Sequence, residues 1–119
     1  MDFLNELKLL GRQISETTFV FNEADELRRG YVQIDRFADG VASVHRIWAN
    51  SPGHGVGSQL LRTLCELADR HRVQIALRAV PFGAKPYPMT QADLDAWYRR
   101  HGFEGGRKLI RQPRVQKAA

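Results

Sequence analysis

Apolar residues change their spacing half-way along this chain of 119 residues, and that change constrains the fold more than any other feature. Up to residue 48, short stretches alternate apolar and polar side chains, which is typical of strands with one buried face. Between residues 58 and 71 the apolar side chains recur every three or four positions, which is typical of an amphipathic helix. The sequence therefore predicts an α/β domain of the α+β type.

The first half predicts a short helix followed by antiparallel strands. Apolar residues have helical spacing over residues 3–10, and Gly11 is a typical helix stop. The pair Asp39-Gly40 favours a tight hairpin turn between two extended stretches. We expect an antiparallel meander formed by residues 17–21, 29–37 and 41–48.

The second half predicts a parallel strand pair. A helix over residues 58–71 and a strand over 73–80 follow the meander. A strand, a helix and a strand in succession join by a right-handed crossover, which would make strands 41–48 and 73–80 parallel. Residues 81–89 hold three of the five prolines and predict a loop.

The last quarter begins with a clear helix signal. Thr90 and Asp93 form a capping box, in which the hydroxyl and the carboxylate each accept a hydrogen bond from an otherwise unpaired N–H group. The helix should run to His101 and end at Gly102. Residues 103–111 are expected to form one or two final strands.

Length and composition fit one domain spanning residues 1–119, because 43% of the residues are hydrophobic and 26% are charged. No apolar run approaches the roughly 20 residues of a membrane span, and the first ten residues carry acids where a signal peptide carries bases. We therefore expect a cytoplasmic protein with no membrane partner.

The single cysteine, Cys65, excludes an internal disulfide and a multi-cysteine zinc site, and its position beside Leu61 and Leu64 favours a core role. The four histidines have no recognised metal spacing, so no metal site is expected.

The net charge of +5 is concentrated at the C-terminal end, where residues 99–119 hold seven Lys or Arg and one Glu. Such a segment can meet nucleic acid, an acidic protein or a phosphorylated small molecule. A solvated segment that keeps the protein soluble is the simpler interpretation, so a nucleic-acid partner is not favoured.

The most informative stretch is the glycine-rich run at residues 51–58, which lies between a predicted strand and a predicted helix. Without Cβ atoms the backbone can turn tightly and direct several N–H groups at one point, and the helix N-terminus adds partial positive charge. The run predicts a cradle for a phosphate or diphosphate, or else a simple connecting turn. It is neither a Walker loop, since no Lys-Ser/Thr pair ends it, nor a dinucleotide fingerprint, since Ser58 stands at the last glycine position.

Two motifs together resemble the GNAT superfamily of N-acetyltransferases. That family carries Q/R-x-x-G-x-G/A between a strand and a helix, and Y-x-x-x-G-F on a later helix. Here the first motif is matched at Gly55 and Gly57, and the second is matched over residues 98–103. Pro52 stands where the family usually has Gln or Arg. The resemblance covers roughly residues 29–111 and implies a GNAT-like mixed, mostly antiparallel central sheet flanked by helices.

The resemblance implies an enzyme that moves an acetyl group from acetyl-CoA to a primary amine by direct attack in a ternary complex. The diphosphate of acetyl-CoA would lie on the backbone of residues 53–58, and an amide of Ile47 or Trp48 would bind the thioester carbonyl. Dimers are common in the family, so a homodimer is compatible with it. The residues that would bind acetyl-CoA are Ile47, Trp48, Gly53, His54, Gly55, Val56, Gly57 and Ser58.

Two residues are candidates for proton transfer. The resemblance implies that Tyr98 is the general acid that protonates the departing thiolate; the alternative is a tyrosine that caps the core. His45 can accept a proton from the amine, or it can be a surface histidine on an alternating strand. His54 contacts phosphate or merely occupies the loop.

Two functions other than catalysis stay open. The chain can be a GNAT-fold binding module without activity that uses its basic C-terminal segment for nucleic acid or an acidic protein. It can also be a regulatory sensor of acyl-CoA. The identity of the acceptor amine is open in every case.

Overall fold

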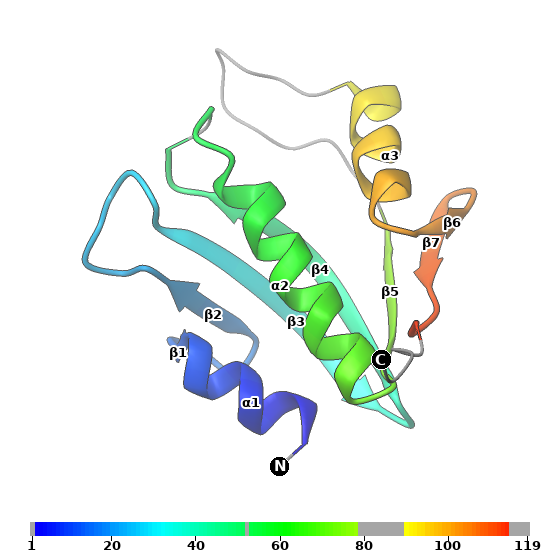
Figure 1. Ribbon diagram of the computed structural model, residues 1–119, viewed down its shortest axis with the longest axis horizontal. Coiled ribbons are helices and arrows are strands. Elements are labelled where there is room, and N and C mark those ends of the chain that lie inside the picture. Colours follow the sequence, from blue (N-terminus) through cyan, green and yellow to red (C-terminus); the bar gives the residue numbers. More distant parts are fainter. Residues whose placement is uncertain (1, 52, 79–89, 115–119) are drawn as a thin grey trace, which may run out of the picture.

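The computed structural model describes residues 2–51, 53–78 and 90–114, which form three helices and one seven-stranded sheet (Figure 1). The strand order is β1-β2-β3-β4-β5-β7-β6. Strands β4 and β5 are parallel, and every other neighbouring pair is antiparallel. The predicted mixed, mostly antiparallel sheet with flanking helices is confirmed, and the arrangement is compatible with a GNAT-like fold.

The first half forms the predicted antiparallel meander. Asp39 and Gly40 have φ values of 55° and 73°, so both central residues of the hairpin turn are left-handed, as an Asp-Gly pair favours. Strand β1 was not predicted, because two residues are too few to show alternation. The elements are α1 (Phe3–Leu10), β1 (Arg12–Gln13), β2 (Thr18–Phe21), β3 (Gly30–Ala38) and β4 (Val41–Ala49).

The second half contains the predicted crossover and the predicted capping box. The helix that follows β4 begins at Val56, two residues before the predicted start, so part of the glycine-rich run belongs to its first turn. Thr90 and Asp93 form the capping box, as predicted. The end of the predicted strand 73–80 and the predicted loop 81–89 lie outside the described residues. The elements are α2 (Val56–Arg70), β5 (Gln74–Arg78), α3 (Gln91–Arg100), β6 (Glu104–Gly105) and β7 (Lys108–Arg111).

The three described helices lie on one side of the sheet (Figure 1). Helix α2 connects β4 to its parallel neighbour β5, and α3 connects β5 to β6, which runs parallel to β5 because both pair antiparallel with β7. Two right-handed crossovers that advance in the same direction place their helices on the same face. Helix α1 packs there too, with the ring centroids of Phe3 and Phe37 5.3 Å apart. None of the helices in the described part of the chain is long and apolar enough to span a membrane.

The core lies between these helices and the sheet. Helix α2 places Leu61, Leu64 and Ala68 against the buried side chains of β3 and β4, and each of the three is at most 1% exposed. Burying a leucine side chain contributes roughly 1.5–3 kcal/mol relative to exposure. The core holds α2 firmly on β4, so the start of the helix is fixed relative to the end of that strand.

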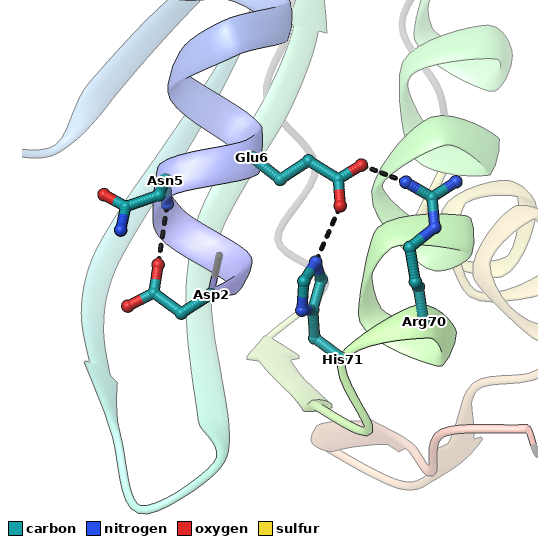
Figure 2. A network of polar contacts seen from close by, with 5 residues as sticks. All are labelled: Asp2, Asn5, Glu6, Arg70 and His71. Atoms are coloured by element: carbon teal, nitrogen blue, oxygen red, sulfur yellow. Dashed lines mark hydrogen bonds and ion pairs between the residues drawn. The ribbon is translucent and has the colours of Figure 1, made fainter.

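Charged side chains fasten the C-terminal end of α2 on two sides. Glu6 of α1 bonds to Nε2 of His71 at 2.7 Å through one carboxylate oxygen, and its other oxygen pairs with Arg70 (Figure 2). On the other side, the carboxylate of Asp69 accepts two hydrogen bonds from the guanidinium of Arg111 at 2.7 and 3.0 Å. The far end of α2 has no such fastening in the described residues.

Candidate functional site

Strands β4 and β5 part half-way along β4. Their parallel pairing runs from Val41 and Gln74 to Val44 and Leu77, and then stops. Strand β4 continues for five more residues while paired only with β3, and the two strands diverge in Figure 1. One edge of β4 beyond Val44 therefore has no strand partner among the described residues.

The ladder between β3 and β4 is irregular at the same level. Gln33 pairs with Arg46, but the next pair joins Ile34 to Val44, so His45 is an extra residue on β4. The register then shifts on the other strand, where Asp35 is left without a partner in the ladder. The two extra residues meet, with Nδ1 of His45 3.3 Å from Oδ2 of Asp35. Bulges of this kind bend strands and re-aim side chains, and they are frequent next to active sites.

A cavity of about 470 Å³ opens where the two strands part. This volume lies within the range of small-molecule sites. His45, which we predicted as a proton acceptor, lines the cavity and is about half exposed. The cavity is lined by Asp35, Ser43, Val44, His45, Arg46, Ala76, Leu77, Arg78 and Lys108.

Ile47 and Trp48 occupy different positions relative to the opening. The N–H of Asn50 donates to the carbonyl of Arg29, and bonded pairs alternate along an antiparallel ladder. The main chain of Trp48 therefore turns toward β3, whereas the amide of Ile47 turns toward the unpaired edge. The indole of Trp48 stacks on Tyr31, with centroids 4.8 Å apart.

The glycine-rich run has the backbone that a cradle requires. Gly53 and Gly55 have φ values of 90° and 72°, a region that side chains rarely adopt. A Cβ atom built on either glycine would have no atom of the described residues within 4 Å, so these residues leave the loop open to a ligand. His54, between the two glycines, is exposed.

The start of α2 offers unpaired donors. Gly55 caps the helix without a side chain, and the first turn contains no acid. The N–H groups of Val56, Gly57 and Ser58 have no acceptor among the described residues, and the first such bond joins the N–H of Gln59 to the carbonyl of Gly55. These donors and the partial positive charge of a 15-residue helix suit an anion.

Helix α3 braces this end of α2. The indole N–H of Trp97 donates to the hydroxyl oxygen of Ser58 at 2.8 Å. The same indole lies 3.6 Å from the place where a Cβ of Gly57 would stand. The hydroxyl of Ser58 is thus used as an acceptor within the fold, and it keeps its own proton for donation.

Tyr98, our predicted general acid, lies in the core and not among the residues that line the cavity. It is 3% exposed, and its ring packs against Trp97 and Phe103. Burial raises the pKa of its hydroxyl to about 12. The group is therefore protonated at neutral pH, so in a proton transfer it can act only as the acid. Its hydroxyl makes no hydrogen bond within the described part of the chain.

Other titratable groups near α2 serve the structure. Cys65 is buried, and this burial raises the pKa of its thiol to about 11, so the predicted core role is confirmed. Arg111 belongs to the basic C-terminal segment, yet it is 3% exposed and bonded to Asp69. Burial acts to raise the pKa of Asp69, but the hydrogen bonds from Arg111 and from the backbone of Arg114 hold it below the usual range. The residues that the structure describes contain no cluster of three potential metal ligands.

Sequence reasoning missed Asp35, Arg78 and Lys108 as cavity residues. A signal for the bulges was present, because apolar spacing grows from two to three residues in both strands. Buried residues in β4 fall at Ala42, Val44 and then Ile47. The position of the cavity itself depends on where β4 and β5 part, which no local pattern reveals.

No protein-family model matches the chain, and no curated protein matches it significantly. Among solved structures, the chain is similar to the crystal structure of the anti-CRISPR protein AcrVA5, with a TM-score of 0.59 and 20% sequence identity. The match covers 79% of this chain and 97% of the other. The likeness is one of fold. At this identity it supports the architecture, and the chemistry must be argued from the site.

Proposed function

We propose that the protein is an acyltransferase that moves an acetyl group from acetyl-CoA to a primary amine. The observation that carries this proposal is the open, acid-free start of α2, whose N–H groups have no acceptor in the described residues. This start follows directly on the strand that parts from β5. The start of α2 would bind the diphosphate of an elongated ligand, and the gap between β4 and β5 would take its thioester end.

The described residues fit acetyl-CoA, which when bound supplies an activated thioester carbonyl. The amides of Val56, Gly57 and Ser58 bind the diphosphate, and the left-handed backbone at Gly53 and Gly55 keeps the loop free of Cβ atoms. His54 lies in the same loop. The amide of Ile47 donates to the thioester oxygen as negative charge develops on it. We assign no such bond to Trp48, because its main chain turns toward β3.

Two side chains handle protons. His45 accepts a proton from the amine as the new C–N bond forms. Tyr98 donates a hydrogen bond or a proton to the sulfur as the C–S bond breaks, and its high pKa makes the donation partial. Positioning therefore matters more than acidity for this tyrosine.

Calorimetric titration with acetyl-CoA tests the cradle. We expect binding by the wild-type protein and at least a tenfold loss of affinity in Gly55→Ala, because the new methyl group would occupy the open side of the loop from which the ligand approaches. Gly40→Ala is the matched control, since Gly40 has a φ of 73° and equally open surroundings but lies in the hairpin turn. Both variants should lose about 1 kcal/mol of stability, because each forces alanine into a left-handed backbone.

Absence of binding at millimolar acetyl-CoA would overturn the proposal. So would equal affinities of the Gly55 and Gly40 variants, since the loss would then come from backbone strain alone. Binding without transfer to any amine would instead favour a sensor of acyl-CoA.

A further inference from the structure

Two cationic side chains lie side by side on neighbouring strands at the cavity. Arg78 at the end of β5 pairs in register with Lys108 at the start of β7, and both side chains are exposed and line the cavity. Like charges directly opposite each other on neighbouring strands destabilise a sheet. Their placement calls for a compensating anion.

The described protein supplies no such anion. Neither Arg78 nor Lys108 takes part in any ion pair among the described residues. Residues 79–89 and 115–119, outside the described part, contain no Asp or Glu. The single acid that lines the cavity is Asp35, and it lies beside His45.

The cavity therefore has a positive side and a mixed side. Arg78 and Lys108 belong to β5 and β7, whereas Asp35 and His45 belong to β3 and β4. The mixed side also includes Arg46 of β4, whose guanidinium lies over the ring of Trp48, 4.1 Å from its centroid. Asp35 attracts an ammonium group and His45 can take its proton, while the two cations attract a carboxylate or a phosphate. This distribution of charge is complementary to a molecule that carries an amine and an anion together.

No helix in the described part of the chain covers the face of the sheet that bears these side chains. The described helices lie on the other face. The connection between β1 and β2 is a short turn, so it adds no helix to the face of the cavity. Asp35, His45, Arg78 and Lys108 are all exposed. Among the described residues, no helix stands between solvent and the cavity on this side of the sheet, so we place the acceptor there.

Building on the proposed acetyl transfer, we propose that the acceptor is a primary amine that also bears a carboxylate or phosphate. Arg78 and Lys108 bind the anionic group, and the amine lies beside His45 and Asp35. A free amino acid, a small phosphorylated amine or a lysine flanked by acids in a peptide would present these same groups.

Matched pairs of acceptors test the proposal, with thiol release from acetyl-CoA as the readout. The pairs are tyrosine with tyramine, phosphoethanolamine with ethanolamine, and blocked pentapeptides whose central lysine is flanked by two Glu or two Gln. We expect kcat/KM to be at least tenfold higher for the anionic member of at least one pair. The pair that responds identifies the source of the anion.

Substitutions of Arg78 and Lys108 then test whether these two residues cause the preference for anionic acceptors. Arg78→Ala and Lys108→Ala should raise the KM of the preferred anionic acceptor at least tenfold and leave its neutral counterpart and acetyl-CoA unaffected. Arg107→Ala is the matched control, because Arg107 is exposed and adjacent in sequence but does not line the cavity.

Several outcomes would overturn the inference while leaving the acetyl transfer intact. One is a preference for the neutral member of every pair. Another is a rise in KM for acetyl-CoA alone, which would assign the cations to its phosphates. If acetyl-CoA does not bind, the proposed function fails, and calorimetric titration of the free protein with tyrosine and tyramine decides the charge preference. Equal or absent binding of the two would then overturn it.

Discussion

Tyr98 has an unusual combination of properties for a proton donor, because its ring is buried and its hydroxyl has a pKa near 12. Removing the hydroxyl in Tyr98→Phe should lower kcat about a hundredfold, within the usual contribution of general acid catalysis. Affinity for acetyl-CoA, measured by calorimetry, should change by less than twofold. The free energy of unfolding should not fall, since the hydroxyl has no hydrogen bond to a described residue. Unchanged turnover would assign Tyr98 to the core alone.

Single residues also mark the limit of what the sequence predicts about the site. His45 and the glycines were identified because their residue types have a known chemistry. In the sequence, Asp35 is only one polar position of an alternating strand, and its role depends on the 3.3 Å distance from its Oδ2 to Nδ1 of His45 across two bulges. Arg78 and Lys108 are neighbours only through the pairing of β5 with β7, whose residues are 30 positions apart in the chain.

At the scale of elements, helix α2 is fastened at its C-terminal end by the ion pair between Asp69 and Arg111 (side-chain exposures 13% and 4%). Asp69→Asn leaves a buried guanidinium without its counter-charge and should cost about 3 kcal/mol at pH 7, measured by urea unfolding. Asp39→Asn is the control, because Asp39 is exposed in the hairpin turn and forms no ion pair with a described residue. Equal effects of both substitutions would show that the pair does not stabilise the fold.

The same pair predicts a pH dependence with a definite sign. The pKa of Asp69 lies below its usual value in the folded protein, so the carboxylate stabilises the fold above the unfolded-state pKa, about 3.9. That stability is lost as the pH falls through the folded-state pKa. The difference in unfolding free energy between wild type and Asp69→Asn should therefore shrink in acid. A difference that stays constant down to pH 2 would contradict this assignment.

At the scale of the whole molecule, most of the fold follows from local patterns. The helices near residues 3–10 and 91–100, the hairpin at Asp39-Gly40 and the parallel crossover were predicted from periodicity, caps and turn residues. The gathering of three helices on one face follows only once β5, β6 and β7 are paired. The sequence could not show where β4 leaves β5. This position depends on two competing ladders, the bulged antiparallel pairing of β4 with β3 and its parallel pairing with β5.

The two bulges compensate each other. Gly30 pairs with Ala49 at one end of the hairpin and Ala38 with Val41 at the other, so one inserted residue in each strand restores the register. Because each bulge is one unpaired residue between pairs that are otherwise in order, excising Asp35 and His45 together should leave a regular hairpin with every buried side chain still facing the helices. Excising either residue alone should leave a single bulge and the same pairs. We expect the double deletion and each single deletion to fold cooperatively by circular dichroism and to lack transfer, because each of them removes the contact between Asp35 and His45. The two residues proposed to handle the amine would then be insertions that the hairpin does not need for folding. A double deletion that cannot fold would show instead that the sheet requires the two bulges.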